Sequence, residues 1–477
     1  MMISINNING ISDSAVISEG KNINHHELSK IISNTAAKYF TKGIKQGDRV
    51  AILSENSLAY VVTVFALWRI NAIPIPLNIR LKEEELRNLI DFSEAKYLLK
   101  SERFSNYLVD KFSIILTVEF EECSIEYKNE TEKDDIAVIL FTSGSSGKPK
   151  GVEITNSNLY ESYLNTTSEY SFTSNDRFLA SLPFYHIGGF SIITRSILSG
   201  GTLIIPNTLK NDALAESFQK HDPTIISLVP TMLKRLIEEG IKPNKNLRLT
   251  FIGGGPSDNS LVREAIDFGW PFVKVYGSTE TCSMVSGISG SRLKDNPSCG
   301  GKAFQNVNIK ILKDSFEEAS PFEIGEISVK SKSIAKGYLN NKEQGDQKIY
   351  NDHYLTGDFG YLDEDGYLFV VSRRTDLIIS GGENIDPSEV EKVLLNHPLI
   401  TDVVVFPVTD KEWGQIPVAA IVLKDDDEQK KHQIISILED QLASFKIPKK
   451  LFFVNELNRN ELGKIDLAKV KTELNLD

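Results

Sequence analysis

The chain has 477 residues, of which 41% are hydrophobic and 25% charged, as is ordinary for a globular protein with more than one domain. Its 53 basic and 65 acidic side chains give a formal net charge of -12, and no block of Lys and Arg stands out, which argues against a nucleic-acid-binding protein. The three cysteines, Cys123, Cys282 and Cys299, are far apart and lack metal-ligand spacing, so we expect neither a disulfide framework nor a cysteine metal site.

The N-terminal sequence has no basic region followed by an apolar core, so it does not predict a signal peptide. The longest apolar run, Tyr60 to Leu67, is too short to span a bilayer and indicates a buried helix. We therefore expect a cytoplasmic protein with no stable membrane insertion.

Helical and strand patterns alternate through the first 280 residues. Continuous apolar runs end in Gly, Ser or Pro turns, and helical patterns follow them. The predicted elements are a helix at 24–40, a strand at 49–53, a helix at 57–70, and strands at 72–77, 136–141, 224–229, 247–252 and 272–276. This alternation predicts an α/β class with layered, largely parallel sheets.

The pattern changes after about Gly300. The short runs NVNIKIL, GEISVK and GYLFVV predict an antiparallel β subdomain. After residue 376 come a strand, a Gly-Gly turn, a helix at 387–395, two strands and a further helix, which suffice for a small α+β domain. We expect two domains, residues 1–373 and a mobile C-terminal domain at 374–477.

The strongest local signal is TSGSSGKPKG, from Thr142 to Gly151, directly after a buried strand. Its glycines allow the backbone N–H groups to form an anion nest, and its hydroxyls and lysines add donors and charge. Pro149 stands where a Walker A loop needs Ser or Thr, and no Gly-x-Gly-x-x-Gly is present. A flexible surface loop is the alternative, but two lysines after a buried strand favour a polyphosphate site.

This loop resembles the phosphate loop of the adenylate-forming superfamily, which includes acyl-CoA synthetases, luciferases and peptide-synthetase adenylation domains. Ser145 and Ser146 replace the two threonines usual there and keep the hydroxyls. The resemblance implies binding of ATP with Mg²⁺. It assigns the phosphate contacts to Thr142, Ser143, Gly144, Ser145, Ser146, Gly147, Lys148 and Lys150.

A second segment that fits the superfamily is VKVYGSTET, residues 273–281. The resemblance implies that Tyr276 stacks on adenine beside Gly277, that the Thr279 hydroxyl meets phosphate and that the Glu280 carboxylate binds Mg²⁺. In isolation Glu280 would be a solvated surface carboxylate. Upstream, the resemblance places a wall against the adenine at Gly254, Gly255 and Pro256.

The third and fourth segments lie near the predicted domain boundary. Asp358 is assigned to the ribose hydroxyls, since a carboxylate can accept two hydrogen bonds from a diol, and Arg373 to the ribose and phosphate side. Asp363 and Asp365 indicate only a hairpin turn. In LIISGGENIDPSEVE, Gly381 and Gly382 permit close backbone approach, and the resemblance assigns them to coenzyme A binding.

Lys464 follows Gly463 in the polar tail NRNELGKID. Most lysines near a C-terminus are simply solvated, but this one aligns with the lysine that relatives place between the attacking carboxylate and the α-phosphate. The predicted catalytic residues are therefore Thr142, Glu280 and Lys464. The resemblance also implies that the C-terminal domain rotates about residues 373–376, where Thr375 takes the place of the usual Asp or Lys.

The acid-binding side is indicated by PFYHIGGFSIITRSILSGG, residues 183–201. His186 is either a packing residue or a contact to an aromatic acid. Arg195 is a lone charge in an apolar helical run, so it should meet either a protein carboxylate or a second carboxylate on the substrate. Thr231 and Ser283 would line the same pocket, whereas Cys282 has no base beside it and is expected to fill space.

These segments look most like the o-succinylbenzoate–CoA ligases of menaquinone biosynthesis, a branch of the superfamily. The resemblance implies a small organic acid, ATP and coenzyme A as partners, and a homo-oligomer is possible. The alternatives are an aryl- or fatty-acyl-CoA synthetase, an enzyme that loads a carrier protein, and a non-catalytic nucleotide sensor. An α/β hydrolase is disfavoured because no Gly-x-Ser-x-Gly motif is present.

Overall fold

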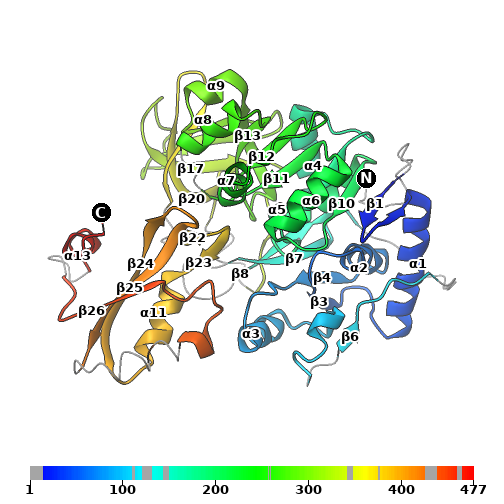
Figure 1. The fold of residues 1–477 in the computed structure, drawn as a ribbon, viewed down its shortest axis with the longest axis horizontal. Helices are drawn as coiled ribbons and strands as arrows, with labels where there is room; N and C mark the ends of the chain where they lie inside the picture. Colours follow the sequence, from blue (N-terminus) through cyan, green and yellow to red (C-terminus); the bar gives the residue numbers. More distant parts are fainter. Residues whose placement is uncertain are drawn as a thin grey trace. The chain divides into compact units, whose positions relative to one another are not determined.

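The computed structural model describes residues 14–109, 113–120, 132–142, 150–255, 257, 259–340, 348–373, 377–424, 434, 438–458 and 465–476. The chain divides into two compact units, and Figure 1 shows its helices and strands in colours that follow the sequence. The large unit holds residues 1–79, 87–141 and 151–372, and the small unit holds residues 80–86, 142–150 and 373–477. Ser143, Pro256, Thr375 and Lys464 lie outside the described residues, as do Gly144 to Lys148.

The helices that precede residue 300 are α1 (His25–Thr41), α2 (Leu58–Arg69), α3 (Glu83–Ser93), the short 3₁₀ helix η2 (Glu102–Phe104), α4 (Asn156–Tyr170), α5 (Ile187–Leu198), α6 (Asn211–His221), α7 (Pro230–Glu238), α8 (Asn259–Asp267) and α9 (Gly290–Asp295). The strands up to residue 289 are β1 (Val16–Ser18), β2 (Lys21–Ile23), β3 (Arg49–Leu53), β4 (Ile73–Pro76), β5 (Tyr97–Lys100), β6 (Ser113–Ile115), β7 (Ile136–Thr142), β8 (Lys150–Thr155), β9 (Arg177–Leu179), β10 (Thr202–Ile205), β11 (Ile225–Leu228), β12 (Leu249–Ile252), β13 (Phe272–Ser278) and β14 (Ser283–Ser289). The later strands of the large unit are β15 (Cys299–Ala303), β16 (Asn308–Leu312), β17 (Gly325–Lys330), β18 (Gly337–Tyr338), β19 (Ile349–Tyr350), β20 (His353–Leu362) and β21 (Leu368–Arg373).

The helix ends show how local sequence specifies these elements. Asn24 caps α1 with a capping box: its side chain accepts a 2.9 Å hydrogen bond from the Glu27 amide, and the Glu27 carboxylate accepts one of 3.0 Å from the Asn24 amide. Ser57 caps α2 by accepting from the amide of Tyr60 at 3.1 Å. The predicted helix at 57–70 therefore includes both cap residues of α2.

A 14-stranded sheet organises the large unit, with the order β16-β17-β20-β21-β15-β14-β13-β12-β11-β9-β10-β1-β2 and β19 paired to β20. The strands from β13 through β12, β11, β9 and β10 to β1 run parallel. Two smaller sheets accompany it, with the orders β4-β3-β5-β6 and β18-β8-β7. The predicted α/β class with layered sheets is confirmed.

Side chains that alternate along the parallel strands divide the core into two layers. On β10, Leu203 and Ile205 join the cluster that contains α5, whereas Ile204 joins the cluster that contains α6, α7 and α8. Phe251 and Ile252 divide in the same way on β12. Strands buried on both faces explain the continuous apolar runs of the sequence.

The change from parallel to antiparallel strands comes earlier than the sequence predicts. It occurs at β14, which pairs antiparallel with β13, rather than after Gly300. The intervening turn includes Cys282 at φ 56° and Ser283 at φ 89°. Because residues other than Gly, Asn and Asp seldom adopt positive φ, this sequence gives no signal for a tight turn.

The small unit contains β22 (Ile378–Ser380), β23 (Glu383–Ile385), α11 (Pro387–Leu395), β24 (Ile400–Asp410), β25 (Gly414–Leu423), β26 (Lys450–Val454) and α13 (Leu467–Glu473). Its sheet has the order β23-β22-β25-β24, with β26 paired to β25. On β25, Ala419 and Ile421 join the α11 core, whereas Val418 and Ala420 join the core on the other face. Helix 387–395 is confirmed with the predicted bounds.

Residues 80–86 belong to the small unit, which no sequence pattern indicates. Lys446, 7% exposed, lies between two carboxylates, 2.6 Å from Glu85 and 2.8 Å from Glu389. Arg80 pairs with the buried Glu383 at 3.0 Å. Among the residues described, no helix combines the length and apolar character that crossing a membrane requires.

Candidate active site

The predicted site residues of the large unit follow neighbouring strands of the parallel sheet. His186 comes after β9, Thr231 after β11 and Gly254 after β12, while Tyr276 lies near the end of β13. These four strands are parallel neighbours in the order β13-β12-β11-β9. Their carboxyl ends therefore meet at one edge of the sheet, where ligands bind in open α/β sheets.

Tyr276 and Asp358 are joined directly. The Tyr276 hydroxyl donates a 2.8 Å hydrogen bond to Oδ2 of Asp358, on β20, and both residues are half-buried. Sequence patterns propose the first for adenine and the second for ribose, so their contact fits one nucleoside-sized site. A fixed aromatic ring offers a flat surface on which a base can stack, and the carboxylate beside it can accept hydrogen bonds from the two hydroxyls of a diol.

Glu280 lies in the tight turn between β13 and β14. The Thr281 hydroxyl accepts from the amide of Ser278 at 2.7 Å and donates to the carbonyl of Ser283 at 2.7 Å. At Gly277 the register shifts, and a Cβ atom there would lie 2.1 Å from the Ser283 carbonyl oxygen. Only glycine allows this close approach, so the predicted Gly277 is required for the turn that presents Glu280.

The Glu280 carboxylate is held by an aromatic cluster. Oε1 accepts a 2.9 Å hydrogen bond from the hydroxyl of Tyr338, which lies 3.5 Å from the hydroxyl of Tyr354. Lys348 Nζ donates to the Tyr354 hydroxyl at 3.4 Å. Burial and the nearby charge of Glu280 raise the pKa of Tyr338 well above its usual value, so its hydroxyl remains a donor.

The described residues contain no group of three His, Cys, Asp or Glu side chains that could hold a metal ion on its own. A single half-buried carboxylate fits Mg²⁺ nevertheless, because this ion keeps several waters and binds mainly through one or two carboxylates and substrate phosphates. Glu280 is thus chemically suited to a magnesium ion that arrives with a nucleotide.

Arg195 lies inside the protein, and none of the described residues forms an ion pair with it. It is 3% exposed, its Nη2 donates to Ser283 Oγ at 3.1 Å, and its Nε makes no hydrogen bond. Ser191, one turn earlier on α5, also approaches Ser283 Oγ, at 3.4 Å. Within the described part of the chain the hydrogen-bond partner of the Arg195 guanidinium is the hydroxyl of Ser283, and no carboxylate pairs with it. Burial lowers the pKa of Arg195 to about 10, so the guanidinium is still charged at neutral pH.

Cys282 is buried beside Arg195. Burial raises the pKa of its thiol to about 12, although the positive charge of Arg195 opposes the shift. The main-chain carbonyl of Cys282 accepts a 2.5 Å hydrogen bond from Ser162, which supports the strained turn. A protonated, enclosed thiol packs as a small apolar group and is a poor nucleophile.

The other substrate-side candidates lie on separate elements. His186 is the N-cap residue of α5 and is half-buried, and its ring makes an edge-type contact with the ring of Tyr185 at 4.7 Å between centroids. Thr231 is half-buried in the first turn of α7. Gly254 is exposed at φ 78°, and Gly255 beside it is half-buried.

Of the predicted phosphate loop only the flanks are described. Thr142 ends β7 and Lys150 begins β8, and these strands are neighbours in the three-stranded sheet. Arg373 is the last residue of β21. The remaining loop residues and Lys464 lie outside the described residues, so their predicted roles stay predictions.

In the small unit, Gly381 and Gly382 form the two-residue turn of the β22–β23 hairpin, with Ser380 opposite Glu383. Both glycines have positive φ, 58° and 88°, as a two-residue hairpin turn of this kind requires. A Cβ atom on Gly381 would lie 2.7 Å from Cε3 of Trp413. The predicted Gly-Gly turn therefore exists, with an indole packed against its backbone.

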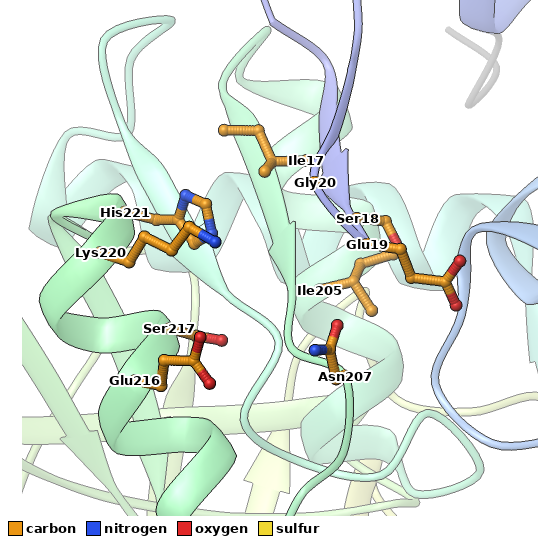
Figure 2. Close-up of a pocket in the computed structure, with 10 residues that line it drawn as sticks. All are labelled: Ile17, Ser18, Glu19, Gly20, Ile205, Asn207, Glu216, Ser217, Lys220 and His221. Carbon is orange, nitrogen blue, oxygen red and sulfur yellow. The ribbon is translucent and has the colours of Figure 1, made fainter.

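Figure 2 shows a further cavity, of about 470 Å³, with the residues that line it. It is formed by the β1–β2 turn, the end of β10 and the last turns of α6, and none of the predicted site residues lines it. Glu19, Asn207, Glu216 and Lys220 on its lining are exposed. This cavity is a polar surface hollow and not the candidate site.

Sequence reasoning missed the partners that hold the predicted residues. Tyr338 contacts Glu280 and lies outside the segments that the motifs single out. Ser191 contacts Ser283 and lies within the predicted acid-binding segment, residues 183–201, but no role was predicted for it. Each contact joins residues far apart in the chain, 58 positions for the first and 92 for the second. A local signal exists for the second contact, because Ser191 and Arg195 are four residues apart and therefore share one face of α5.

Comparisons with known proteins place the chain in a family. The family model "AMP-binding enzyme" matches residues 9–339, and the model "AMP-binding enzyme C-terminal domain" matches residues 389–464. The chain is 36% identical over 428 residues to the 2-succinylbenzoate–CoA ligase of Bacillus thuringiensis subsp. konkukian, covering 89% of this chain and 88% of the relative. It is 34% identical over 457 residues to the enzyme of that name from Bacillus subtilis, covering 94% and 93%.

Solved structures give the same picture. The o-succinylbenzoate CoA synthetase of Bacillus subtilis, bound to the product analogue OSB-NCoA, matches with a TM-score of 0.91 at 33% identity, covering 97% of this chain and 96% of that chain. The same protein in complex with ATP and magnesium ion matches with a TM-score of 0.74 at 33% identity, covering 96% and 97%.

Proposed function

The chain belongs to the family of AMP-binding enzymes, and on that premise we propose that it joins o-succinylbenzoate to coenzyme A through an acyl-adenylate. The overall reaction consumes ATP and releases AMP and pyrophosphate. Its product, o-succinylbenzoyl-CoA, belongs to menaquinone biosynthesis. ATP and coenzyme A are cytoplasmic metabolites, and the described cysteines Cys282 and Cys299 are free, which supports a cytoplasmic location.

The nucleotide is held where Tyr276 and Asp358 meet. The Tyr276 ring takes the adenine beside Gly254, Gly255 and Pro256, and Asp358 and Arg373 take the ribose. We assign the phosphate contacts to residues of the loop from Thr142 to Lys150 and to Thr279, as the family resemblance implies. Magnesium, held through Glu280, would offset the negative charge of the phosphates. The hydrogen bond between Tyr276 and Asp358 supports this arrangement because it fixes both groups before the nucleotide arrives.

The first half-reaction forms a bond between a carboxylate oxygen of the acid and the α-phosphorus, and breaks the bond from that phosphorus to the pyrophosphate leaving group. Two anions approach each other in this step, so a cation between them lowers the barrier. We assign that role to Lys464 and assign a phosphate contact to the Thr142 hydroxyl. Lys464 lies outside the described residues, and its assignment rests on the family resemblance.

The observation that carries the choice of acid is the buried Arg195 with its unpaired Nε. An isolated charge in an apolar interior is unfavourable unless an anion joins it. With no protein carboxylate on Arg195 among the described residues, an acid with a second carboxylate supplies the missing partner. In o-succinylbenzoate the succinyl carboxylate is activated and the aromatic carboxylate faces Arg195 and Ser283. His186 and Thr231 line the ring.

In the second half-reaction the thiol of coenzyme A attacks the acyl carbonyl carbon, and the bond to AMP breaks. We assign the approach of the thiol to the hairpin turn at Gly381 and Gly382, after the C-terminal domain rotates about residues 373–376. A backbone turn without side chains lets a narrow thiol-bearing arm pass close to the main chain.

The test is acid-dependent exchange of labelled pyrophosphate into ATP with o-succinylbenzoate, coumarate, benzoate and a fatty acid. Thioester products are then identified by mass spectrometry after coenzyme A is added. Exchange with o-succinylbenzoate far above the other acids is expected. Preference for a monocarboxylic acid would refute the substrate alone, and no exchange with any acid would refute the adenylation.

A further inference from the structure

Glu280 is held at both its main chain and its side chain by one short segment. The Ala335 amide donates to the carbonyl of Glu280 at 2.8 Å, and three residues later the Tyr338 hydroxyl donates to its carboxylate at 2.9 Å. A turn residue fixed at these two points has little freedom to move its carboxylate. The segment around Tyr338 therefore determines where the charge of Glu280 lies.

That segment is itself fixed to the strand that leaves the phosphate loop. Strand β18 pairs antiparallel with β8, with Tyr338 opposite Val152, and the Leu339 amide donates to the Gly151 carbonyl at 2.7 Å. Gly151 directly follows Lys150, where the loop ends. At its other end, Asn158 donates to the carbonyls of Lys332 and Ile334 at 2.9 and 2.8 Å. The position of Tyr338 thus follows that of β8.

The hydrogen bond leaves half of the carboxylate for a ligand. Tyr338 donates to Oε1, and this is the hydrogen bond that the described residues make to the Glu280 carboxylate, so Oε2 is left for a ligand. Tyr338 and Tyr354 are each 5% exposed, so the ring behind Glu280 cannot swing into water. A bond from a rigid neighbour to one oxygen fixes the direction in which the other oxygen points.

We propose that Tyr338 is a positioning residue that orients Glu280 toward the magnesium ion of MgATP, with its hydroxyl bonded to one carboxylate oxygen and the other turned to the metal. This inference rests on the proposed role of Glu280. Outer partners of metal ligands are worth about 10- to 100-fold in metal affinity. Removal of the Tyr338 hydroxyl is therefore expected to weaken the magnesium-dependent part of ATP binding by about tenfold or more.

The experiment measures ATP binding by calorimetry without acid or coenzyme A, once in excess Mg²⁺ and once in EDTA. For Tyr338→Phe we expect about tenfold weaker binding in Mg²⁺ and unchanged binding in EDTA. Tyr354→Phe is the matched control, since it removes the same group from an equally buried ring that does not bond Glu280. Equal loss in both media, or wild-type binding in both, would overturn the inference.

Glu280→Gln separates this inference from the proposed function. If Glu280→Gln leaves the magnesium dependence unchanged, the assigned role of Glu280 is wrong; if it abolishes the dependence and Tyr338→Phe does not, only the role of Tyr338 is wrong. If Tyr338→Phe fails to fold, Glu280→Asp is measured instead, because the shorter side chain keeps the negative charge but moves the carboxylate out of reach of the Tyr338 hydroxyl. It should show the same magnesium-specific loss, and wild-type binding of MgATP would then contradict the inference.

Discussion

Replacement of Arg195 by methionine tests the substrate assignment in the most direct way. Methionine fills a similar volume without charge, so it removes the guanidinium from an interior where it is 3% exposed. In the free protein Arg195 makes a hydrogen bond to Ser283, while its Nε makes none. Its charge is therefore poorly compensated until an anion binds.

The size of the effect follows from these contacts. A hydrogen bond between charged partners contributes about 1.5–3 kcal/mol, and about 1.4 kcal/mol corresponds to a factor of ten. Arg195→Met should therefore lower kcat/KM for o-succinylbenzoate by roughly 10- to 150-fold. An analogue without the aromatic carboxylate should lose little. Stability should be unchanged or higher, because apolar groups often replace buried charge without cost.

The assays are steady-state kinetics with both acids and urea unfolding of the ligand-free protein. Arg248→Met is the matched control, because Arg248 pairs with the buried Asp176 through two hydrogen bonds of 2.7 Å. Removal of the Arg248 guanidinium leaves the buried Asp176 carboxylate without its ionic partner and should lower the free energy of unfolding by about 3 kcal/mol. The reasoning fails if Arg195→Met loses stability as Arg248→Met does, or if both acids suffer equally.

Three further predictions concern other parts of the chain. Gly381→Ala places a Cβ atom 2.7 Å from Trp413 at a φ of 58°, so thioester formation should fall at least about tenfold while pyrophosphate exchange persists. Gly20→Ala is the control, because Gly20 has a φ of 75° and open space around it. Parallel loss of both half-reactions in Gly381→Ala would contradict the assignment. Lys464→Ala should abolish pyrophosphate exchange yet spare transfer from pre-made acyl-adenylate to coenzyme A, and equal loss of both would refute its role. Burial raises the pKa of Asp176, but hydrogen bonds from Arg248, Thr173 and Thr224 outweigh burial and hold this pKa below its ordinary value. The ionised carboxylate therefore stabilises the fold above about pH 4, and this stabilisation is lost as the pH falls through the folded-state pKa. The gap in unfolding free energy between wild type and Asp176→Asn should therefore narrow from pH 7 to pH 3, and a gap that widens would show the sign to be wrong.

Periodicity and capping predict much of the fold. Helix α2 and strand β3 lie where the sequence places them, because an apolar run flanked by cap residues leaves few alternatives. Strand β14 was not anticipated. It begins at Ser283, which has a positive φ that its sequence does not favour, so tertiary contacts such as the one from Ser162 to the Cys282 carbonyl must hold the turn.

The candidate site was predicted as single residues rather than as contacts. Tyr276 and Asp358 were assigned separately to adenine and ribose, and their hydrogen bond spans 82 positions. The two residues lie on β13 and β20 of one sheet, and the strand order of that sheet makes their contact possible. Contacts between residues so far apart in the chain depend on the topology of the sheet, and local sequence patterns do not predict them.

The contrast between Arg195 and Tyr338 shows which functional residues a sequence reveals. A charge inside an apolar helix conflicts with its surroundings, so the sequence alone singles out Arg195. In the structure its Nη2 bonds only the neutral Ser283 hydroxyl, and its buried Nε has no hydrogen-bond partner among the described residues. Tyr338 conflicts with nothing, because an aromatic residue in a short strand satisfies every local preference. Its hydroxyl gains meaning only through a carboxylate 58 positions away. Residues whose chemistry conflicts with their local sequence can therefore be found from the sequence alone. Residues that support them fit their local sequence, so they can be identified only from the folded structure.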